Sequence, residues 1–203
     1  SAAQMGDEAR GDGAGDARKT HAQGRYAGPK ALVEVVVRSG SIGKALEAKF
    51  NAVRAAYGRF LVRKVWRKVV PRKVVFEQFH GNGFGCNMKY IALELMRRGG
   101  WELVWLANRP QDGEYPPGIR VVARKSTAAL RELATAGFWC SNHNIGHFIR
   151  HRGLVKKPGQ FYLQTWHGSF GIKCCHDVTS PEERSMVDAV LTNGKFGTEH
   201  MRH

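Results

Sequence analysis

Apolar side chains recur at every third or fourth position between residues 44 and 70. They are Leu46, Phe50, Val53, Tyr57, Leu61 and Val65. This spacing places them on one face of an α-helix, and Pro71 predicts the end of the helix because proline cannot continue one. Gly58 weakens the middle of this predicted helix. The apolar run at residues 32–37 fits either a strand or the edge of a helix.

Beyond Pro71, short apolar runs alternate with helical segments. Strands are expected at residues 74–79, 103–106, 121–122, 138–140 and 161–165. Helices are expected at residues 88–98 and from Ser126 to Leu133, and a further helix start is expected at Ser180, which Pro181 follows. Such alternation predicts an α/β fold with a mostly parallel, Rossmann-like sheet and right-handed crossovers.

Composition divides the chain into three regions. Residues 1–30 are rich in glycine, alanine and aspartate and have almost no large apolar side chains. They cannot bury enough surface to offset the entropy of ordering, so we expect disorder there. Residues 31–72 form the expected basic amphipathic helix region, and residues 73–203 form the expected Rossmann-like domain.

The formal net charge of +15 predicts an anionic partner. Residues 44–73 contain ten Lys or Arg and a single acid, Glu47. A basic amphipathic helix suits an anionic membrane surface. The candidate membrane-binding residues are Arg59, Arg63, Lys64, Arg67 and Lys68. The same pattern also fits a solvated helix that packs one face on its own domain, or a calmodulin-type or RNA-binding element.

Several classes of protein are disfavoured by what the sequence lacks. No apolar run reaches the roughly 18 residues that a membrane span needs, and no secretory signal opens the chain. Four cysteines, two of them adjacent, fit a reducing compartment. No nucleic-acid-binding signature is present, so nucleic acid is not an expected partner. The chain is therefore expected to be cytosolic, although it could still lie on a membrane.

Two loops follow predicted strands and carry candidate chemistry. The first runs from His80 through Gly81 and Gly83 to Asn87 and Lys89. Its glycines let the backbone approach a phosphate, and the next helix offers free amides. The spacing differs from the dinucleotide-binding pattern, and a tight turn that needs positive φ is the structural alternative.

The second loop, directly after the strand at 161–165, contains Trp166, His167, Gly168 and Ser169. Histidine titrates near neutrality and is the commonest general base, so His167 is the candidate catalytic residue. The alternative is a histidine that only hydrogen-bonds locally at the end of a strand.

Other clusters offer weaker candidates. The run Cys174-Cys175-His176-Asp177 lacks the separated ligand pairs of a structural zinc site, so no metal and no cofactor are expected. His143, His147 and His151 recur every four residues, as on one face of a helix that could bind an anionic polymer but is more often solvated. Glu183 and Asp188 show no carboxylate partner, so a two-acid glycosidase has no support.

Three blocks in order resemble the CDP-glycerol glycerophosphotransferase family. Residues 74–91 resemble its opening strand and glycine-containing turn, residues 159–169 its block ending in Trp-His-Gly, and residues 192–196 a further segment. Met88 stands where the family usually has proline, and the residues after the Trp-His-Gly block also depart from its pattern. These departures are Phe170-Gly171-Ile172 and Cys174-Cys175.

The resemblance implies the N-terminal, acceptor-side half of a GT-B-like fold of two Rossmann-like domains. It implies transfer of glycerol phosphate or ribitol phosphate from a CDP-alditol to an anionic polyol-phosphate acceptor on lipid, with release of CMP. It also implies a peripheral location on the cytoplasmic face of the cell membrane. His167 would activate the acceptor hydroxyl, while Lys89, Lys173 and the loop amides would contact phosphate. It also implies a nucleotide domain beyond residue 203, without which the chain would be a poor enzyme. A sugar-nucleotide glycosyltransferase and a non-enzymatic polymer- or membrane-binding module remain the alternatives.

Overall fold

The computed structural model describes residues 29–110, 115–166, 181–192 and 194–200. The chain divides into two units, residues 1–43 and residues 44–203. The expected disorder of residues 1–30 falls almost entirely outside the described residues. The described chain opens with helix α1 (Pro29–Phe60), which settles the apolar run at residues 32–37 as helix.

The predicted helix end at Pro71 is wrong. A single π-helical turn, η1 (Leu61–Val65), follows α1, and strand β1 (Val70–Glu77) already contains Pro71. The register between β1 and β4 (Ala136–Ser141) shifts between Val70 and Val74. Proline is tolerated at such an irregularity because it has no N–H to contribute to the ladder. Pro71 therefore marks a bulge near the start of β1 instead of a helix end.

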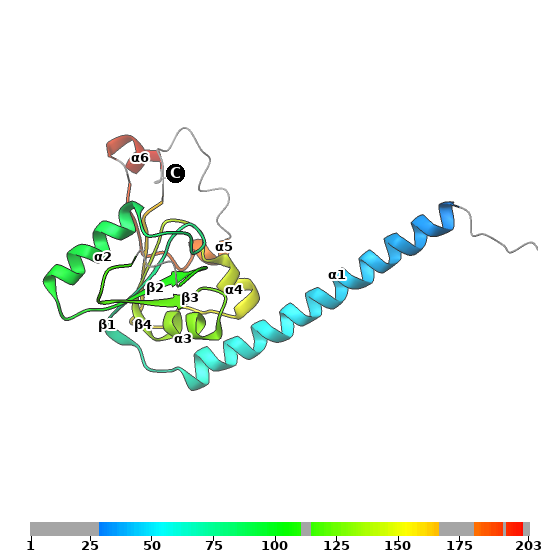
Figure 1. Ribbon diagram of the computed structural model, residues 1–203, viewed down its shortest axis with the longest axis horizontal. Coiled ribbons are helices and arrows are strands. Elements are labelled where there is room, and N and C mark those ends of the chain that lie inside the picture. The colour runs from blue at the N-terminus through cyan, green and yellow to red at the C-terminus, as the bar shows by residue number, and fades with distance from the viewer. Residues whose placement is uncertain (1–28, 111–114, 167–180, 193, 201–203) are drawn as a thin grey trace, which may run out of the picture. The chain divides into compact units, whose positions relative to one another are not determined.

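The described residues form a six-stranded sheet with the strand order β3-β2-β1-β4-β5-β6 (Figure 1). All of its strand pairs are parallel. The remaining strands are β2 (Glu102–Ala107), β3 (Ile119–Ala123), β5 (Phe161–Gln164) and β6 (Ala189–Val190). The helices after β1 are α2 (Cys86–Arg98), α3 (Thr127–Thr135), α4 (Gly146–Arg152), α5 (Pro181–Arg184) and α6 (Lys195–His200). The predicted α/β fold with a parallel sheet is confirmed.

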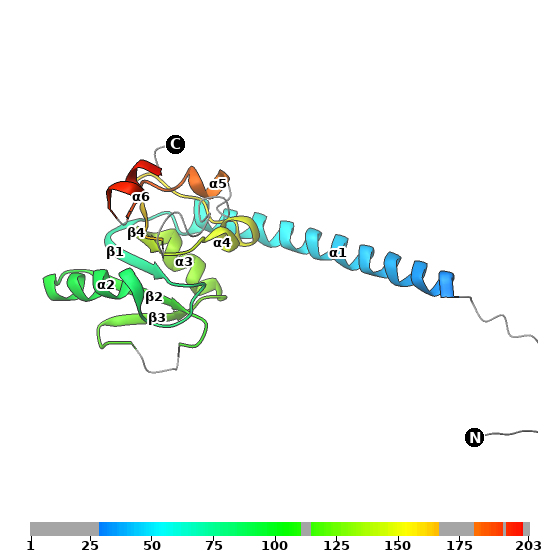
Figure 2. The same cartoon turned by 90° about the horizontal axis from the view of Figure 1, so that it is seen from above.

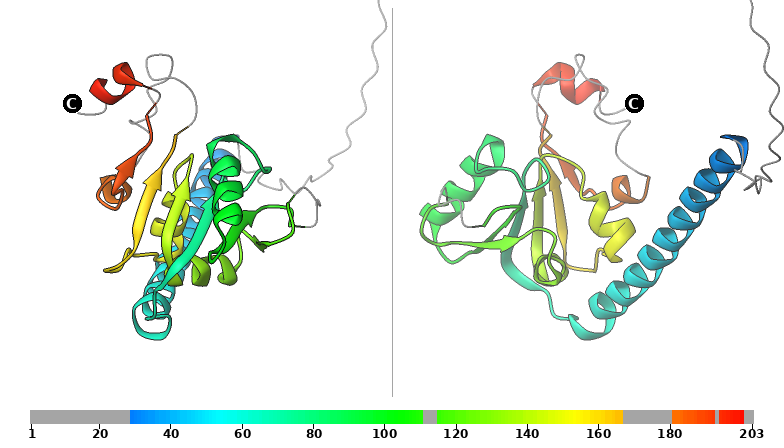
Figure 3. Two further views of the ribbon diagram at one scale, coloured as in Figure 1. Left: turned by 90° about the vertical axis from the view of Figure 1, so that its left-hand side faces the viewer. Right: turned by 45° about the vertical axis from the view of Figure 1, so that its right-hand side comes forward.

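Helices cover the two faces of the sheet in separate layers (Figures 2 and 3). Alternate residues of β1 point to opposite faces, so Val74 and Phe76 pack in the cluster with α2, whereas Val75 packs in the cluster with α3 and α4. The layer with α3 and α4 also receives Val62 of η1, which is fully buried. The packing of Val62 ties the end of the helical segment to the core.

Two glycines bring α1 close to the end of α4. A Cβ on Gly58 would lie 1.9 Å from the carbonyl oxygen of Arg152, and one on Gly153 would lie 2.0 Å from that of Ala55. Gly153 also has φ +68°, in the left-handed region that favours glycine. Gly58, which weakens the helix by propensity, is thus explained by backbone contact.

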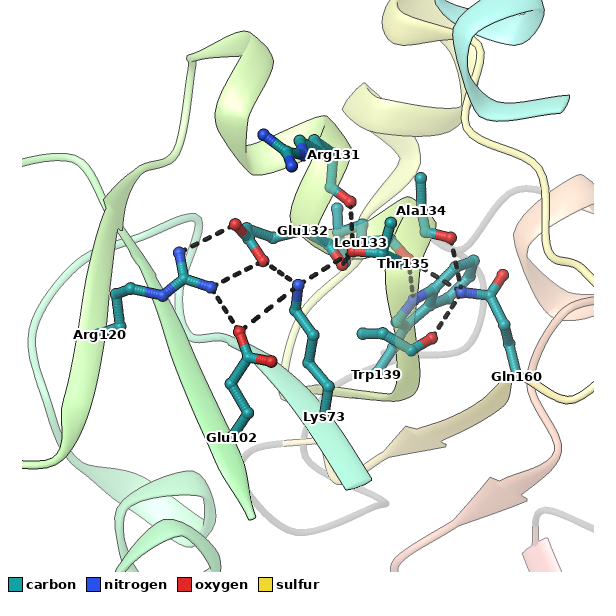
Figure 4. A network of polar contacts seen from close by, with 11 residues as sticks. Lys73, Glu102, Arg120, Arg131, Glu132, Leu133, Ala134, Thr135, Trp139 and Gln160 are labelled. Carbon is teal, nitrogen blue, oxygen red and sulfur yellow. Dashed lines mark hydrogen bonds and ion pairs between the residues drawn. The ribbon is translucent and has the colours of Figure 1, made fainter. Parts of the chain in front are cut away.

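A polar network links β1, β2, β3 and α3 near the amino ends of the strands (Figure 4). Lys73 is buried, forms an ion pair with Glu132 and donates a 2.9 Å hydrogen bond to Thr135 Oγ1. Arg120 bridges Glu132 at 2.9 Å and Glu102 at 2.7 Å. Burial raises the pKa of Glu132, but hydrogen bonds from Arg120 and Lys73 outweigh it and hold the pKa below its usual range. These contacts neutralise the charges that the strand ends bury.

Candidate active site at the carboxyl edge of the sheet

Polar side chains stand in one row where the central strands end. Glu77 is opposite Ser141 in the register of β1 and β4, and Ser141 is opposite Gln164 in that of β4 and β5. All three residues are buried, with exposures of 1–2%. Ligands of parallel α/β sheets bind beyond this carboxyl edge. The row therefore forms the floor of the candidate site.

Glu77 forms a buried ion pair with Arg124, which follows β3. Arg124 Nε donates to Glu77 Oε1 at 2.6 Å, and Ser141 Oγ donates to Glu77 Oε2 at 3.3 Å. Burial raises the pKa of Glu77, while the Arg124 guanidinium and Ser141 oppose that rise. Arg124 also lies over the ring of Phe148, with Cζ 5.4 Å from the centroid. The pair fixes a guanidinium beside the strand ends.

The loop between β1 and α2 is held by Gln78. The side chain of Gln78 accepts from the Gly85 amide at 2.9 Å and donates to the Asn82 carbonyl at 3.2 Å, so it braces the loop from within. Phe79 has φ +40° and His80 has φ +57°, which is uncommon for residues with side chains. Such strain persists only where surrounding contacts enforce it, and it concentrates at functional sites.

Two histidines gather beside Arg124 and form, with Glu77 and Ser141, what we call the carboxyl-edge cluster. The rings of His80 and His143 are 3.9 Å apart between centroids, and Arg124 Nη2 lies 3.4 Å from Nδ1 of His80. A neutral His80 can accept from the guanidinium through that nitrogen. A Cβ on Gly81 would lie 2.7 Å from Cδ of Arg124, so glycine gives the arginine room. The cluster can present cationic and donor groups to an anion.

The chain segment that leads to His167 is anchored at the same edge. Gln164 Nε2 donates to the His143 carbonyl at 3.1 Å, and its Oε1 accepts from the Trp166 amide at 3.1 Å. The Thr165 amide donates to the Ser141 carbonyl at 2.8 Å. Trp166 is 5% exposed and has φ +51°. The backbone is therefore fixed at the residue before His167.

Earlier residues of the same sequence block have structural roles. Gln160 Nε2 donates to the carbonyls of Ala136 at 2.6 Å and Leu133 at 2.9 Å, which satisfies acceptors at the end of α3. Tyr162 donates its hydroxyl to Glu183 at 2.9 Å, and Glu183 also accepts from the Ile145 amide at 2.7 Å. These contacts hold β5 in place and so position the loop that follows it.

The structure brings some of the predicted site residues together. His80 and Gly81 lie against Arg124, while Gly83 belongs to the braced loop and accepts a 3.2 Å hydrogen bond from Trp105 through its carbonyl. Asn87 and Lys89 lie in the first turn of α2, and Lys89 Nζ is 5.9 Å from the centroid of the Phe84 ring. The other predicted residues, His167, Gly168, Ser169 and Lys173, lie outside the described residues, as do Cys174 and Cys175.

Sequence reasoning missed Glu77, Arg124 and Ser141, and it grouped His143 wrongly. His143 precedes α4 and its ring contacts that of His80. Of the three histidines, His147 and His151 share that helix, with ring centroids 5.4 Å apart. The available signal was position: Glu77 and Ser141 are polar residues at the ends of apolar strands. Arg124 gave no comparable signal, because its partner is 47 residues away along the chain.

Metal ligands do not gather in the described part of the chain. No group of three or more His, Cys, Asp or Glu side chains there could hold a metal ion. Burial raises the pKa of the Cys140 thiol to about 12, so this cysteine is a packing residue. The side chains of the carboxyl-edge cluster supply imidazole, guanidinium, carboxylate and hydroxyl groups.

Comparison with known proteins identifies the family to which this sequence belongs. The model of the family described as CDP-Glycerol:Poly(glycerophosphate) glycerophosphotransferase matches residues 60–194. The chain belongs to this family. The match includes the carboxyl-edge cluster and the stretch around His167.

Two curated relatives of this glycerophosphotransferase family member are teichoic acid poly(glycerol phosphate) polymerases. The Staphylococcus epidermidis protein is 26% identical over 151 residues, which cover 66% of this chain and 20% of the relative. The Bacillus subtilis protein is 33% identical over 107 residues, which cover 51% of this chain and 14% of the relative. The chain thus matches a fifth or less of the length of either relative.

Solved structures of the wall teichoic acid polymerase TagF have the same fold. A histidine-to-alanine variant matches with a TM-score of 0.57 at 25% identity, covering 80% of this chain and 44% of that one. Another histidine variant, soaked with CDPG for 15 minutes, matches with a TM-score of 0.58 at 25% identity, covering 81% and 44%. The parallel sheet agrees with the predicted Rossmann-like half of a GT-B-like fold.

Proposed function

We propose that this chain is the acceptor-side half of an enzyme that transfers glycerol phosphate, or ribitol phosphate, from a CDP-alditol to a teichoic-acid-type acceptor and releases CMP. The family match over residues 60–194 carries the proposal. The soak of a TagF variant with CDPG favours CDP-glycerol as the donor. The acceptor is proposed to be a polyol-phosphate chain on lipid, because the family's curated relatives are poly(glycerol phosphate) polymerases.

In the proposed reaction His167 is the general base. It takes the proton of the acceptor hydroxyl, and the oxygen then forms a bond to the β-phosphorus of the donor. The bond between that phosphorus and the CMP oxygen breaks, and CMP leaves with the bonding pair. Positioning and charge stabilisation account for most catalysis of phosphoryl transfer. The anchored Trp166 supports this role because it fixes the backbone where His167 begins.

The carboxyl-edge cluster is proposed to orient the acceptor's own phosphates. Arg124 is held beside the imidazoles of His80 and His143 at the edge where ligands of such sheets bind. Guanidinium groups and imidazoles donate well to phosphate oxygens. The loop amides near Gly81 and Gly83, together with Lys89, Gly168, Ser169 and Lys173, complete the proposed set of phosphate contacts.

The experiment that tests this proposal is CMP release from CDP-glycerol by the full-length gene product. His167→Ala should lower turnover by roughly 10²-fold or more, as loss of a general base does. His151→Ala, which removes an imidazole outside the cluster, serves as the matched control and should retain turnover. Near-normal turnover of His167→Ala would remove this residue from the mechanism. Release of UDP from a sugar nucleotide in place of CMP would instead support a glycosyltransferase.

We also propose that α1 and the residues after it lie on an anionic membrane surface. Its apolar row is exposed: Leu46, Phe50, Val53 and Tyr57 have 62–70% of their surface accessible. Ala55, Gly58 and Val62 lie on another side of the helical segment and are buried. The face that packs on the domain is therefore a different one. None of the described helices is both long enough and apolar enough to span a bilayer.

A further inference from the structure

A pocket lined by cations opens between α1, α3 and α4. Its volume is about 250 Å³. Arg54, Lys125 and Arg152 line it, together with Tyr57, Ser126 and Thr127, and no carboxylate of the described residues takes part. A space of this size is smaller than the roughly 300–1,000 Å³ of sites for drug-sized ligands. It suits a small anionic group better than a whole nucleotide.

Arg152 is the most constrained of these cations. It is 5% exposed, and its Nη1 and Nη2 donate to the Lys125 carbonyl at 2.9 Å and to Thr127 Oγ1 at 3.3 Å. Both acceptors are neutral, and within the described residues no carboxylate forms an ion pair with this guanidinium. A buried charge without a counter-charge is costly. An anion in the pocket would remove that cost.

The electrostatics of a neighbouring histidine report the same excess of positive charge. The pKa of His147 is lowered to about 4, first by burial and then by Arg124, His151, Arg152 and Arg54. Burial, and then Arg54, also lowers the pKa of Arg152. The positive charges of α1 and α4 therefore repel one another across the pocket, and no carboxylate of the described residues is among the groups that shift these two pKa values.

Backbone geometry adds donors at the same place. α3 has nine residues and begins at the pocket, where Ser126 Oγ already accepts from the Ala129 amide at 3.1 Å. The amides of Thr127 and Ala128 belong to the first turn, which has no intrahelical acceptors. A helix N-terminus favours negative charge, and phosphate suits both amides and guanidinium forks. The walls are held in position because Gly58 lets α1 approach Arg152 closely.

We propose that this pocket binds a phosphate group, with Arg54, Lys125 and Arg152 as its cationic ligands. The site shares no residue with the carboxyl-edge cluster, and it does not depend on the transfer reaction proposed above. Its phosphate belongs either to an anionic lipid headgroup or to a soluble phosphate compound, since both present the same oxygens. The proximity of the pocket to the exposed row of α1 makes the headgroup a chemically suitable source.

An NMR titration with inorganic phosphate tests whether the pocket binds. The readout is the side-chain Nε–H resonances of Arg54 and Arg152 in the 203-residue chain. Phosphate should shift both resonances, and Lys125→Gln should raise the dissociation constant measured at Arg152 at least tenfold. Arg131→Gln removes an exposed cation from α3 outside the pocket and should change it less than twofold. Lys125 is the main variant because it is exposed, so its replacement should leave the fold intact. Arg152→Gln, at a buried position, is a second variant and should abolish the phosphate-dependent shift at Arg54.

A vesicle assay then distinguishes the two sources. Binding to vesicles of mixed phosphatidylglycerol and phosphatidylcholine is compared for Arg54→Gln/Lys125→Gln and for Arg97→Gln/Arg131→Gln, which loses the same two charges outside the pocket. If the pocket variant binds the vesicles at least tenfold more weakly than the control does, the phosphate belongs to a lipid headgroup. Equal binding of the two variants identifies a soluble phosphate compound. If inorganic phosphate leaves both arginine resonances in place, the proposal is overturned whatever the vesicles show, because surface charge alone can hold a basic chain on them.

Discussion

At the scale of single residues, the pairing of Glu77 with Arg124 links the ends of two strands that are not neighbours. Glu77 closes β1 and Arg124 follows β3, with β2 between them in the sheet. A buried pair of this kind is costly to break, because removing one partner leaves the other charge without compensation. The pair therefore ties the shape of the carboxyl edge to the stability of the fold.

Replacement of Arg124 should destabilise the domain in a pH-dependent way. Burial already holds the pKa of Glu77 above its usual range, and Arg124→Met should raise that pKa further. A carboxyl whose pKa is raised in the folded state lowers stability once the pH exceeds its pKa in the unfolded chain, which is about 4.3 for glutamate. We expect urea unfolding to show a loss of about 3–5 kcal/mol at neutral pH and a smaller loss near pH 4.

The double variant Glu77→Gln/Arg124→Met is the control for this prediction. It removes both charges, so a substantial part of the stability lost at neutral pH should return. An equal loss for Arg124→Met at both pH values, with no recovery in the double variant, would show that packing of the arginine stem and not its charge is responsible.

The sequence predicted residues of the site where residue type alone was informative. His80 and Gly81 stood out as a histidine and a glycine directly after a predicted strand, and the structure places both against Arg124. The place of His143 in the site was not predicted, because it depends on a contact with the ring of His80, with centroids 3.9 Å apart across 63 residues of chain. Periodicity placed it on a helix face, yet α4 begins only at Gly146. Contacts between distant segments carry no local signal.

At the scale of elements, α1 shows how packing overrides propensity. Gly58 and Gly43 lie in the same helix and have the same low helix propensity. Only Gly58 is in backbone contact with α4, whereas a Cβ on Gly43 would meet nothing within 4 Å. Packing therefore requires glycine at position 58, whereas it places no such requirement on position 43.

Alanine substitutions at these two positions should change stability in opposite directions. Gly58→Ala would force α1 away from the Arg152 carbonyl, and overpacking of this kind costs about 1–3 kcal/mol. Gly43→Ala should instead stabilise the helix by up to about 1 kcal/mol, since alanine has the higher propensity. Thermal or urea unfolding of the two single variants measures the difference. A stabilised Gly58→Ala would mean that α1 does not rest on α4.

Boundaries of elements were predicted less well than their existence. The helix at Ser126 was predicted from its cap, and Ser126 Oγ does accept from the Ala129 amide. β1 was expected to begin after Pro71, but it begins at Val70 because the shifted register with β4 accommodates a residue without an N–H. A cap acts within one turn of chain, whereas a bulge is defined by the partner strand.

At the scale of the whole molecule, alternation of strands and helices was enough to predict the parallel sheet. The strand order was not accessible in the same way, because the position of β1 between β2 and β4 follows from long-range packing. Net charge was readable directly, and its concentration in residues 44–73 underlies the proposed membrane contact.

Neutralising the basic residues at and after η1 should abolish the proposed membrane contact. Neutralising Arg63, Lys64, Arg67 and Lys68 to Gln removes about 1 kcal/mol of attraction per residue near an anionic surface, so vesicle affinity should fall by roughly 10²-fold or more. A control with Arg97, Arg98, Arg109 and Arg131 changed to Gln loses the same charge elsewhere. Cosedimentation with phosphatidylglycerol-containing vesicles compares them. Equal losses would indicate only a net-charge effect, and no loss in either would exclude membrane binding through these residues.

The central place of β1 has a consequence during synthesis on the ribosome. β1 emerges before both of its neighbours, and Ser141, which lies opposite Glu77, is translated 64 residues later. At 5–20 residues per second this delay is about 3–13 s, in which one edge of an apolar strand is open to other nascent chains. Pro71 and Lys73 lie on that strand, and proline and lysine are the residues that discourage edge-to-edge pairing. Pro71 and Lys73 can thus also protect the nascent chain from pairing with other chains until β4 has been synthesised.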